Sequence, residues 1–132
     1  MKRILIGTLA YVLVSFASQA TSHFAINAEH YASIPFMRTE PIMILGILTM
    51  IIQGGVLSYL YGFFSRENTG IGNGLLFGLL IALFFVSYPA LVEPSKYIVP
   101  SVGAWMAVEG LVGLVQFSLF GTALGWIFSR VQ

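Results

Sequence analysis

The chain alternates long runs that contain no Asp, Glu, Lys or Arg with short charged segments. The four runs are Ile4–Ala28, Pro41–Ser65, Asn68–Val92 and Gly110–Ser129. A helix of about 20 mostly apolar residues crosses the hydrocarbon core of a bilayer. The runs are continuously apolar and lack the alternation of a barrel strand, so helices are indicated. We predict an all-α, integral membrane four-helix bundle, one transmembrane domain over residues 1–132, with spans at about 4–23, 41–65, 71–92 and 102–129.

The composition indicates lipid as the solvent of this chain. Hydrophobic residues make up 58% of the sequence and charged residues 8%, whereas a soluble domain has about 25% charged residues. The chain has no cysteine, which excludes disulfides and thiolate metal sites. A net charge of +1 provides no basic patch for nucleic acid. We expect a multi-pass protein of the cell inner (plasma) membrane, with the lipid bilayer as its first partner.

The basic residues indicate an orientation for the spans. Four of them lie at the two termini and in the turn after the second span, and two lie in the other loops: Lys2, Arg3, Arg66 and Arg130 against Arg38 and Lys96. Positive residues favour the cytoplasmic side. The sequence therefore predicts that both termini are cytoplasmic (N-in/C-in).

The first span also has features of a cleavable signal peptide. Lys2 and Arg3 precede its apolar run, and Ser18-Gln19-Ala20 offers a small-residue cleavage site. The polar positions of this run recur with helical period, which a signal core does not require. We expect the segment to be retained as a membrane span.

The two halves of the chain are weakly similar helical hairpins. Each half ends in Phe-Ser-Arg, at Phe64-Ser65-Arg66 and at Phe128-Ser129-Arg130, and each has a proline in its outer loop. Few other positions match. A true duplication and a chance echo of alternating spans both remain open.

Polar side chains recur with helical period in three of the four spans. Residues at i, i+3, i+4 and i+7 share one face of a helix. The faces carry Thr8, Tyr11, Ser15, Ser18, Gln19 and Ser22 on the first span, Gly46, Thr49 and Gln53 on the second, and Glu109, Gly113 and Gln116 on the fourth. The third span is almost entirely apolar over 75–86, so we expect it to be the most lipid-exposed helix.

The three polar faces are expected to converge. At 1.5 Å per residue, Glu109 is placed about 12 Å below the outer boundary, level with Ser15 and Thr49. Two glutamines lie deeper, close to the level of Thr8. We predict an intramembrane polar site that consists of Glu109, Gln116, Gln53, Thr49, Ser15 and Gln19.

Two interpretations of these polar residues remain open. Hydrogen bonds between membrane helices contribute about 0.6 kcal/mol each on average, which is enough to explain glutamines and hydroxyls as contacts that hold helices together. Glu109 is different, because a charge within the bilayer costs at least about 2.5 kcal/mol and an intramembrane acid is a functional candidate by default. The alternatives are a polar path or ligand pocket and a hydrogen-bonded structural acid.

Small residues form further faces that predict close helix packing. They are Gly55, Ser58 and Gly62 on the second span, and Gly110, Gly121 and Gly125 on the fourth, where Gly121 and Gly125 form a GxxxG motif. Small residues allow membrane helices to approach closely. Packing within one chain, a homo-oligomer and contact with a membrane-protein partner all fit this pattern.

The first outer loop holds the best candidates for a metal site, although they are weak ones: His23, Glu29 and His30. Imidazole and carboxylate suit zinc, copper or iron, but the spacing matches no established site. No cofactor is indicated by any motif. No nucleophile elbow, phosphate-binding glycine loop or paired zinc motif is present either, so we expect a protein that is not an enzyme.

Three stretches resemble a known group of proteins. With Met-Lys-Arg-Ile-Leu-Ile-Gly at the start, Gly-Leu-Leu-Phe-Gly-Leu-Leu in the third span and Glu-Gly-Leu-Val-Gly in the fourth, the chain resembles small uncharacterised four-helix inner-membrane proteins of bacteria. This resemblance implies no activity. The short multidrug transporters also have four spans, but their essential acid lies in the first span. Glu109 lies in the fourth, so that family is not assigned.

Three functions follow as expectations. The first is a non-enzymatic accessory or partner-binding subunit of a membrane assembly, because loops are short and small-residue faces are abundant. The second is a small transporter or channel-like protein that uses the polar site around Glu109. The third is a metal- or cofactor-binding membrane protein that uses His23 and His30.

Overall fold

The computed structural model describes residues 1–38 and 40–131, and this part of the chain is helical without strands. Four helices are long and apolar enough to cross a membrane, Lys2–Ile26, Met43–Phe64, Ile71–Lys96 and Val102–Arg130. The prediction of four apolar membrane-spanning helices is confirmed in this sense of length and composition.

Two of the four spans contain a π-helical turn near one end. The described elements are α1 (Lys2–Thr21), a π-helical turn Ser22–Ile26, α2 (Ala28–Ala32), α3 (Met43–Phe64), α4 (Ile71–Ser87), a second π-helical turn Tyr88–Val92, α5 (Glu93–Lys96) and α6 (Val102–Arg130). Proline cannot donate a backbone hydrogen bond. Pro89 therefore changes the helical pattern of the third span without ending the span.

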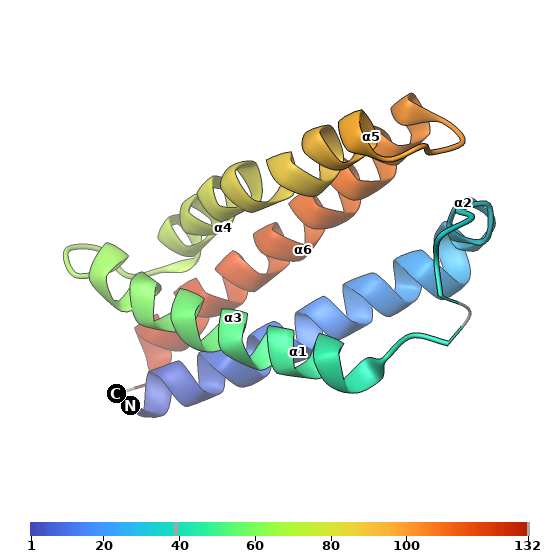
Figure 1. The fold of residues 1–132 in the computed structure, drawn as a ribbon. Coiled ribbons are helices and arrows are strands. Elements are labelled where there is room, and N and C mark those ends of the chain that lie inside the picture. Colours follow the sequence, from blue (N-terminus) through green and yellow to red (C-terminus); the bar gives the residue numbers. More distant parts are fainter. Residues whose placement is uncertain (39, 132) are drawn as a thin grey trace.

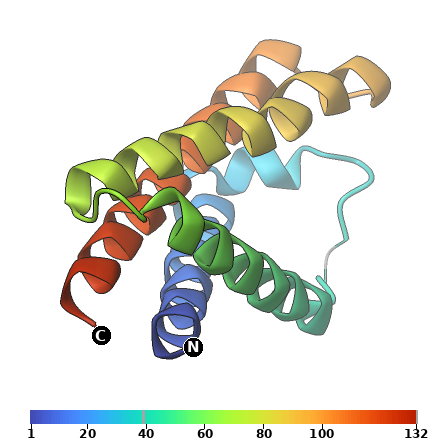
Figure 2. The ribbon, with the colours of Figure 1, turned by 90° about the vertical axis from the view of Figure 1, so that its left-hand side faces the viewer.

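The helices are arranged in two pairs that meet through α1 and α6. α1 packs against both α3 and α6, and α4 runs along α6, whereas α3 and α4 have few contacts with each other (Figures 1 and 2). Both chain termini and the turn between α3 and α4 lie at one end, which we call the terminal end (Figure 1). The other end, with α2 and α5, is called the loop end.

Glycines bring the backbones of α4 and α6 together. A methyl group placed on Gly74 would lie 2.6 Å from the backbone N of Gly125, and one placed on Gly121 would lie 2.7 Å from the Cα of Gly78. Only residues without a side chain allow this approach. The GxxxG motif of α6 therefore packs within the chain.

The expectation that the third span is the most lipid-exposed is wrong. In the 18-residue apolar stretch of that span, 28% of the residues are buried inside the protein, against 11% in the corresponding stretch of α3. The third span is buried because its glycines allow close packing against α6. Glycine is not a polar residue, so a search for polar faces does not reveal this contact. α3 is the helix with the least burial, although its face carries Thr49 and Gln53.

The other small-residue positions divide into close contacts and open ones. Ser58 is fully buried beside Gly7. Gly54, rather than the predicted Gly55, makes the close approach to α1, because a methyl group there would lie 2.9 Å from the Cβ of Tyr11. For Gly55 and Gly62 the nearest atoms would lie at 3.9 and 3.7 Å, and Gly103 and Gly110 have open space.

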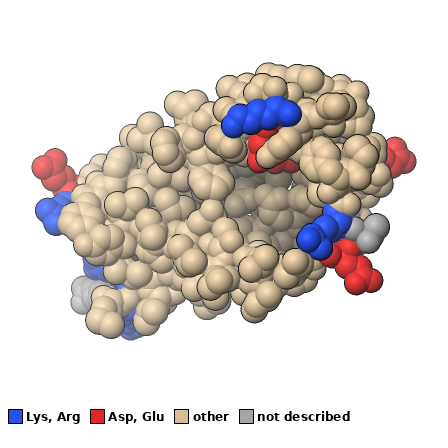
Figure 3. All heavy atoms as spheres, viewed as in Figure 1, with Lys and Arg blue, Asp and Glu red and all other residues tan. Residues whose placement is uncertain are grey.

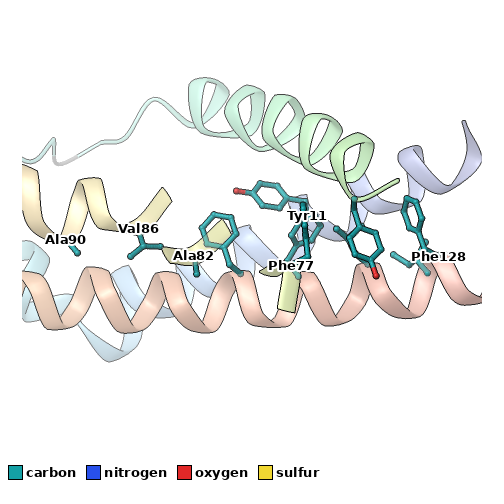
Figure 4. Close-up of a cluster of buried hydrophobic side chains, with 11 residues drawn as sticks. Tyr11, Phe77, Ala82, Val86, Ala90 and Phe128 are labelled. Atoms are coloured by element: carbon teal, nitrogen blue, oxygen red, sulfur yellow. The ribbon is translucent and has the colours of Figure 1, made fainter. Parts of the chain in front are cut away.

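Aromatic and aliphatic side chains fill the space between the helices toward the terminal end. Tyr61, Phe120 and Leu124 are all inaccessible to solvent. Phe128 packs its ring edge against Tyr61 at 5.0 Å between centroids. Figure 4 shows the cluster extending along α6 from Ala90 to Phe128. This packed core leaves the polar side chains nearer to the loop end.

Candidate functional site

A cavity of about 510 Å³ lies between the helices in the half of the molecule nearer the loop end. It is lined by Tyr11, Ser15 and Gln19 from α1, Leu45, Gly46, Thr49, Met50 and Gln53 from α3, Phe85, Val86, Pro89 and Glu93 from the third span, and Glu109, Gly113, Gln116 and Phe117 from α6. Figure 3 shows the hollow on one side of the molecule, with both acidic and basic side chains at its edge.

All six residues of the predicted polar site line this one cavity. They come from three helices that are far apart in sequence, and the structure places them around a common space: Glu109, Gln116, Gln53, Thr49, Ser15 and Gln19. Tyr11 and Glu93 also line it, although the sequence did not assign them to the site. Tyr11 lies on the predicted polar face of the first span, so the sequence contained a signal that could have assigned it to the site. Glu93 carried no such signal, because it follows the predicted third span, which ends at about residue 92.

Two sets of hydrogen bonds link the helices across the cavity. Gln19 Nε2 donates to Gln116 Oε1 at 2.8 Å, and Gln116 Nε2 donates to Ser15 Oγ at 2.9 Å. The hydroxyl of Tyr11 donates to Gln53 Oε1 at 2.7 Å. Gln116 is only 6% exposed, so these bonds satisfy a polar side chain that would otherwise be costly to bury.

The predicted depth of Gln116 is wrong. Its partners are Ser15 and Gln19, so it lies about two helical turns nearer to the loop end than Thr8. Counting residues inward from helix ends assumes straight helices that start at one height. Here α6 is the longest helix and crosses α1 at an angle (Figure 1), so its register against α1 is set by packing.

The polar face of the first span is divided between two sides of the molecule. Ser18 and Ser22 line a separate, mostly apolar groove between α1 and α6. Thr8 donates to the backbone carbonyl of Ile4 within its own helix. Thr49 lines the cavity but also donates within its helix, to Leu45 O at 2.8 Å. Its oxygen remains available as an acceptor toward the cavity.

Glu109 receives a hydrogen bond from the loop end. The hydroxyl of Tyr31 in α2 donates to Glu109 Oε1 at 3.1 Å. The ring of His23 stacks on the Tyr31 ring with centroids 3.6 Å apart, and the Oγ of Ser22 lies 3.5 Å from the Tyr31 hydroxyl. Burial among these groups positions Tyr31 as the partner of Glu109. The second carboxylate, Glu93, lines the same cavity as Glu109.

Tyr31 lies outside the four spans, and burial raises its pKa from 10.0 to about 12. Below pH 10 the phenol is protonated in both the folded and the unfolded chain. Between pH 10 and 12 only the unfolded chain ionises, so the stability contributed by the neutral phenol is lost as the pH rises through this range. We expect the ultraviolet titration of the protein minus that of Tyr31→Phe to show a step near pH 12. A step near pH 10 would contradict the buried Tyr31–Glu109 contact.

The electrostatic character of the cavity is acidic. Glu109 and Glu93 both line it, and none of its described lining residues is Lys, Arg or His. Basic side chains lie farther out, at the rim of the hollow (Figure 3), and His30 is near enough to interact with the Glu109 charge. Amide and hydroxyl oxygens add further acceptors. Two like charges that share one space raise the cost of ionising both, and a bound cation removes that cost. The arrangement is suited to a ligand that carries positive charge and hydrogen-bond donors.

Both π-helical turns lie at the loop end, and the second one lines the cavity through Pro89. Such turns are rare and are often found at functional sites. In the second turn, Pro89 lines the cavity, and its carbonyl accepts a hydrogen bond from Trp105 Nε1 at 2.8 Å. In the first, His23 has its Nδ1 3.0 Å from the carbonyl of Gln19. Side chains thus replace part of the regular hydrogen bonding that these turns give up.

The structure does not bring His23, Glu29 and His30 together as a metal site. Over residues 1–38 and 40–131, no group of three or more His, Cys, Asp or Glu side chains could hold a metal ion. His23 stacks on one face of Tyr31, and His30 meets the same ring edge-on at 5.3 Å between centroids. Glu29 is exposed. The two histidines thus pack around Tyr31 of α2, whose hydroxyl contacts Glu109.

No protein-family model, curated protein or solved structure matches the chain.

Proposed function

We propose that this protein binds a small organic cation within the membrane, as a transporter or channel-like protein does, and that Glu109 is the binding carboxylate. The observation that carries the proposal is the cavity itself, whose described lining combines Glu109 and Glu93 with acceptor side chains and contains no Lys, Arg or His. An ionised acid in the bilayer is costly without a counter-charge. A cationic ligand supplies that charge.

The packed core closes the cavity toward the terminal end, and this indicates the side from which the ligand enters. Tyr11 lines the cavity, and its ring packs edge-on against Phe120 at 4.7 Å between centroids. The core beyond it contains Tyr61 and Leu124, which are inaccessible to solvent. If the termini are cytoplasmic, as the basic residues favour, the cavity belongs to the outer half of the bilayer of the inner membrane. The ligand is then taken up from the outer side by a four-helix bundle in its outward-open form.

The role of an accessory subunit is the weaker alternative. It was expected mainly because small-residue faces were available for a partner. The closest approaches on these faces are made within the chain, by Gly74 and Gly78 to Gly121 and Gly125. If the polar residues served only to hold the helices together by hydrogen bonds, no cavity between the helices would be needed. The cation-binding function accounts for the cavity and for both of its acids.

The test uses the purified protein in lipid nanodiscs and two probes, methylammonium and octylammonium. We expect Glu109→Gln to weaken the binding of at least one probe tenfold or more by calorimetry, because it keeps the shape of the side chain and removes its charge. Glu67→Gln is the matched control, since Glu67 is exposed in the turn at the terminal end. The proposal fails if neither probe shows binding that depends on Glu109.

A further inference from the structure

The cavity opens sideways, between α3 and the third span. Its walls on the two sides are Leu45, Gly46 and Met50 from α3 and Phe85 and Pro89 from the third span. These two helices have few contacts, and they diverge from the turn that joins them (Figures 1 and 2). The space-filling view shows the hollow from this side (Figure 3). A ligand can therefore reach the cavity between two membrane-spanning helices.

The two helix faces beside this opening are apolar, and charged side chains lie elsewhere on the rim of the hollow (Figure 3). Leu45 and Phe85 are both exposed, at 57% and 44% of their surface. No Asp, Glu, Lys or Arg is present from Pro41 to Ser65 or from Asn68 to Val92. In a bilayer these side chains contact lipid chains, so a ligand that enters between them is already dissolved in the membrane.

Side chains of the loop end cover one side of Glu109. Tyr31, Ile34 and Trp105 pack together as a small buried cluster. The Tyr31 hydroxyl contacts the carboxylate from this cluster. A ligand that came from the loop end would have to pass these side chains, whereas the lateral opening is lined by Gly46, which has open space in front of it.

We propose that the ligand is an amphiphilic amine that reaches the cavity from the lipid through the opening between α3 and α4. Its ammonium group binds Glu109 and the neighbouring acceptors. Its alkyl chain lies along Leu45, Met50 and Phe85 and extends toward the bilayer. This inference rests on the proposed function and names the class of its ligand. It accounts for a cavity whose lining combines carboxyl and amide groups with apolar side chains of α3 and the third span.

The experiment compares octylammonium with methylammonium in nanodiscs, using the full chain. We expect octylammonium to bind at least tenfold more tightly, with a difference that Glu109→Gln abolishes. Gly46→Leu should remove at least fivefold of the octylammonium affinity and change methylammonium affinity less than twofold, because a leucine there occupies the path of the alkyl chain. Gly46→Ala should give an intermediate effect.

The matched control is Gly103→Leu, at another position near a helix start where added atoms meet open space. It should leave both affinities unchanged, and circular dichroism should show the same helix content for all variants. If both probes bound equally and in a Glu109-dependent way, the proposal of an amphiphilic ligand would be overturned, while the proposed function would remain intact. A chain-length advantage that persists in Glu109→Gln would mean partition into lipid alone and would also overturn it. No Glu109-dependent binding of either probe would refute both proposals.

Discussion

Gly121→Ala is expected to lower the free energy of unfolding by about 3 kcal/mol, at the upper end of the usual cost of overpacking a close-fitting contact. The added methyl group would lie 2.7 Å from the Cα and 2.8 Å from the N of Gly78. Both are backbone atoms, so no side chain can rotate away. α4 and α6 would have to separate along their shared contact.

The control for this change is Gly110→Ala, in the same helix. A methyl group on Gly110 meets no atom within 4 Å, and alanine is the better helix former by about 0.5–1 kcal/mol. Unfolding is measured by circular dichroism during titration of mixed micelles with a denaturing detergent. Equal stability of the two variants would show that the glycine contact between α4 and α6 does not hold the helices together.

Phe120→Ala is expected to cost about 3 kcal/mol, the lower end of the range for removing a buried phenylalanine. Phe120 is inaccessible to solvent and its ring supports Tyr11, which forms the end wall of the cavity. The loss comes from packing contacts that neither lipid nor neighbouring side chains can restore.

The matched variant is Phe84→Ala, because Phe84 is 80% exposed on the lipid-facing side of α4. Lipid chains fill the space that its ring leaves, so we expect a change below about 1 kcal/mol. The same detergent titration measures both proteins. If Phe84→Ala destabilised the protein as much as Phe120→Ala, the core beneath the cavity would not be the source of stability inferred from its burial.

The extent of the helices was predictable from sequence because lipid imposes it. A backbone in hydrocarbon must satisfy its own hydrogen bonds, and a span needs a certain length. The charge-free runs therefore predicted the four long apolar helices that are observed. Details at the loop end were not predictable in this way. The first helical span continues through a π-helical turn to Ile26, and Pro89 is accommodated by a second such turn.

Much of the candidate site was also visible in the sequence, since helical period places polar residues on one face. The stripe on each helix showed which residues can face a neighbour, and Ser15, Gln53 and Glu109 do line one cavity. Period alone gives no register between helices. The glutamine at position 116 was placed too deep for this reason, and Glu93 was omitted because its helix extends beyond the apolar run.

The sequence by itself determined that this chain has four apolar spans, that three of them carry polar faces and that one acid lies among them. These are properties of single helices, which follow from local period and from the cost of charge in lipid. Only the tertiary structure decided which helices pair. Contacts between glycine backbones brought α4 against α6 and left α3 apart from α4. Because that pairing is set by shape complementarity between distant segments, the cavity and its lateral opening appear only when all four helices are in place.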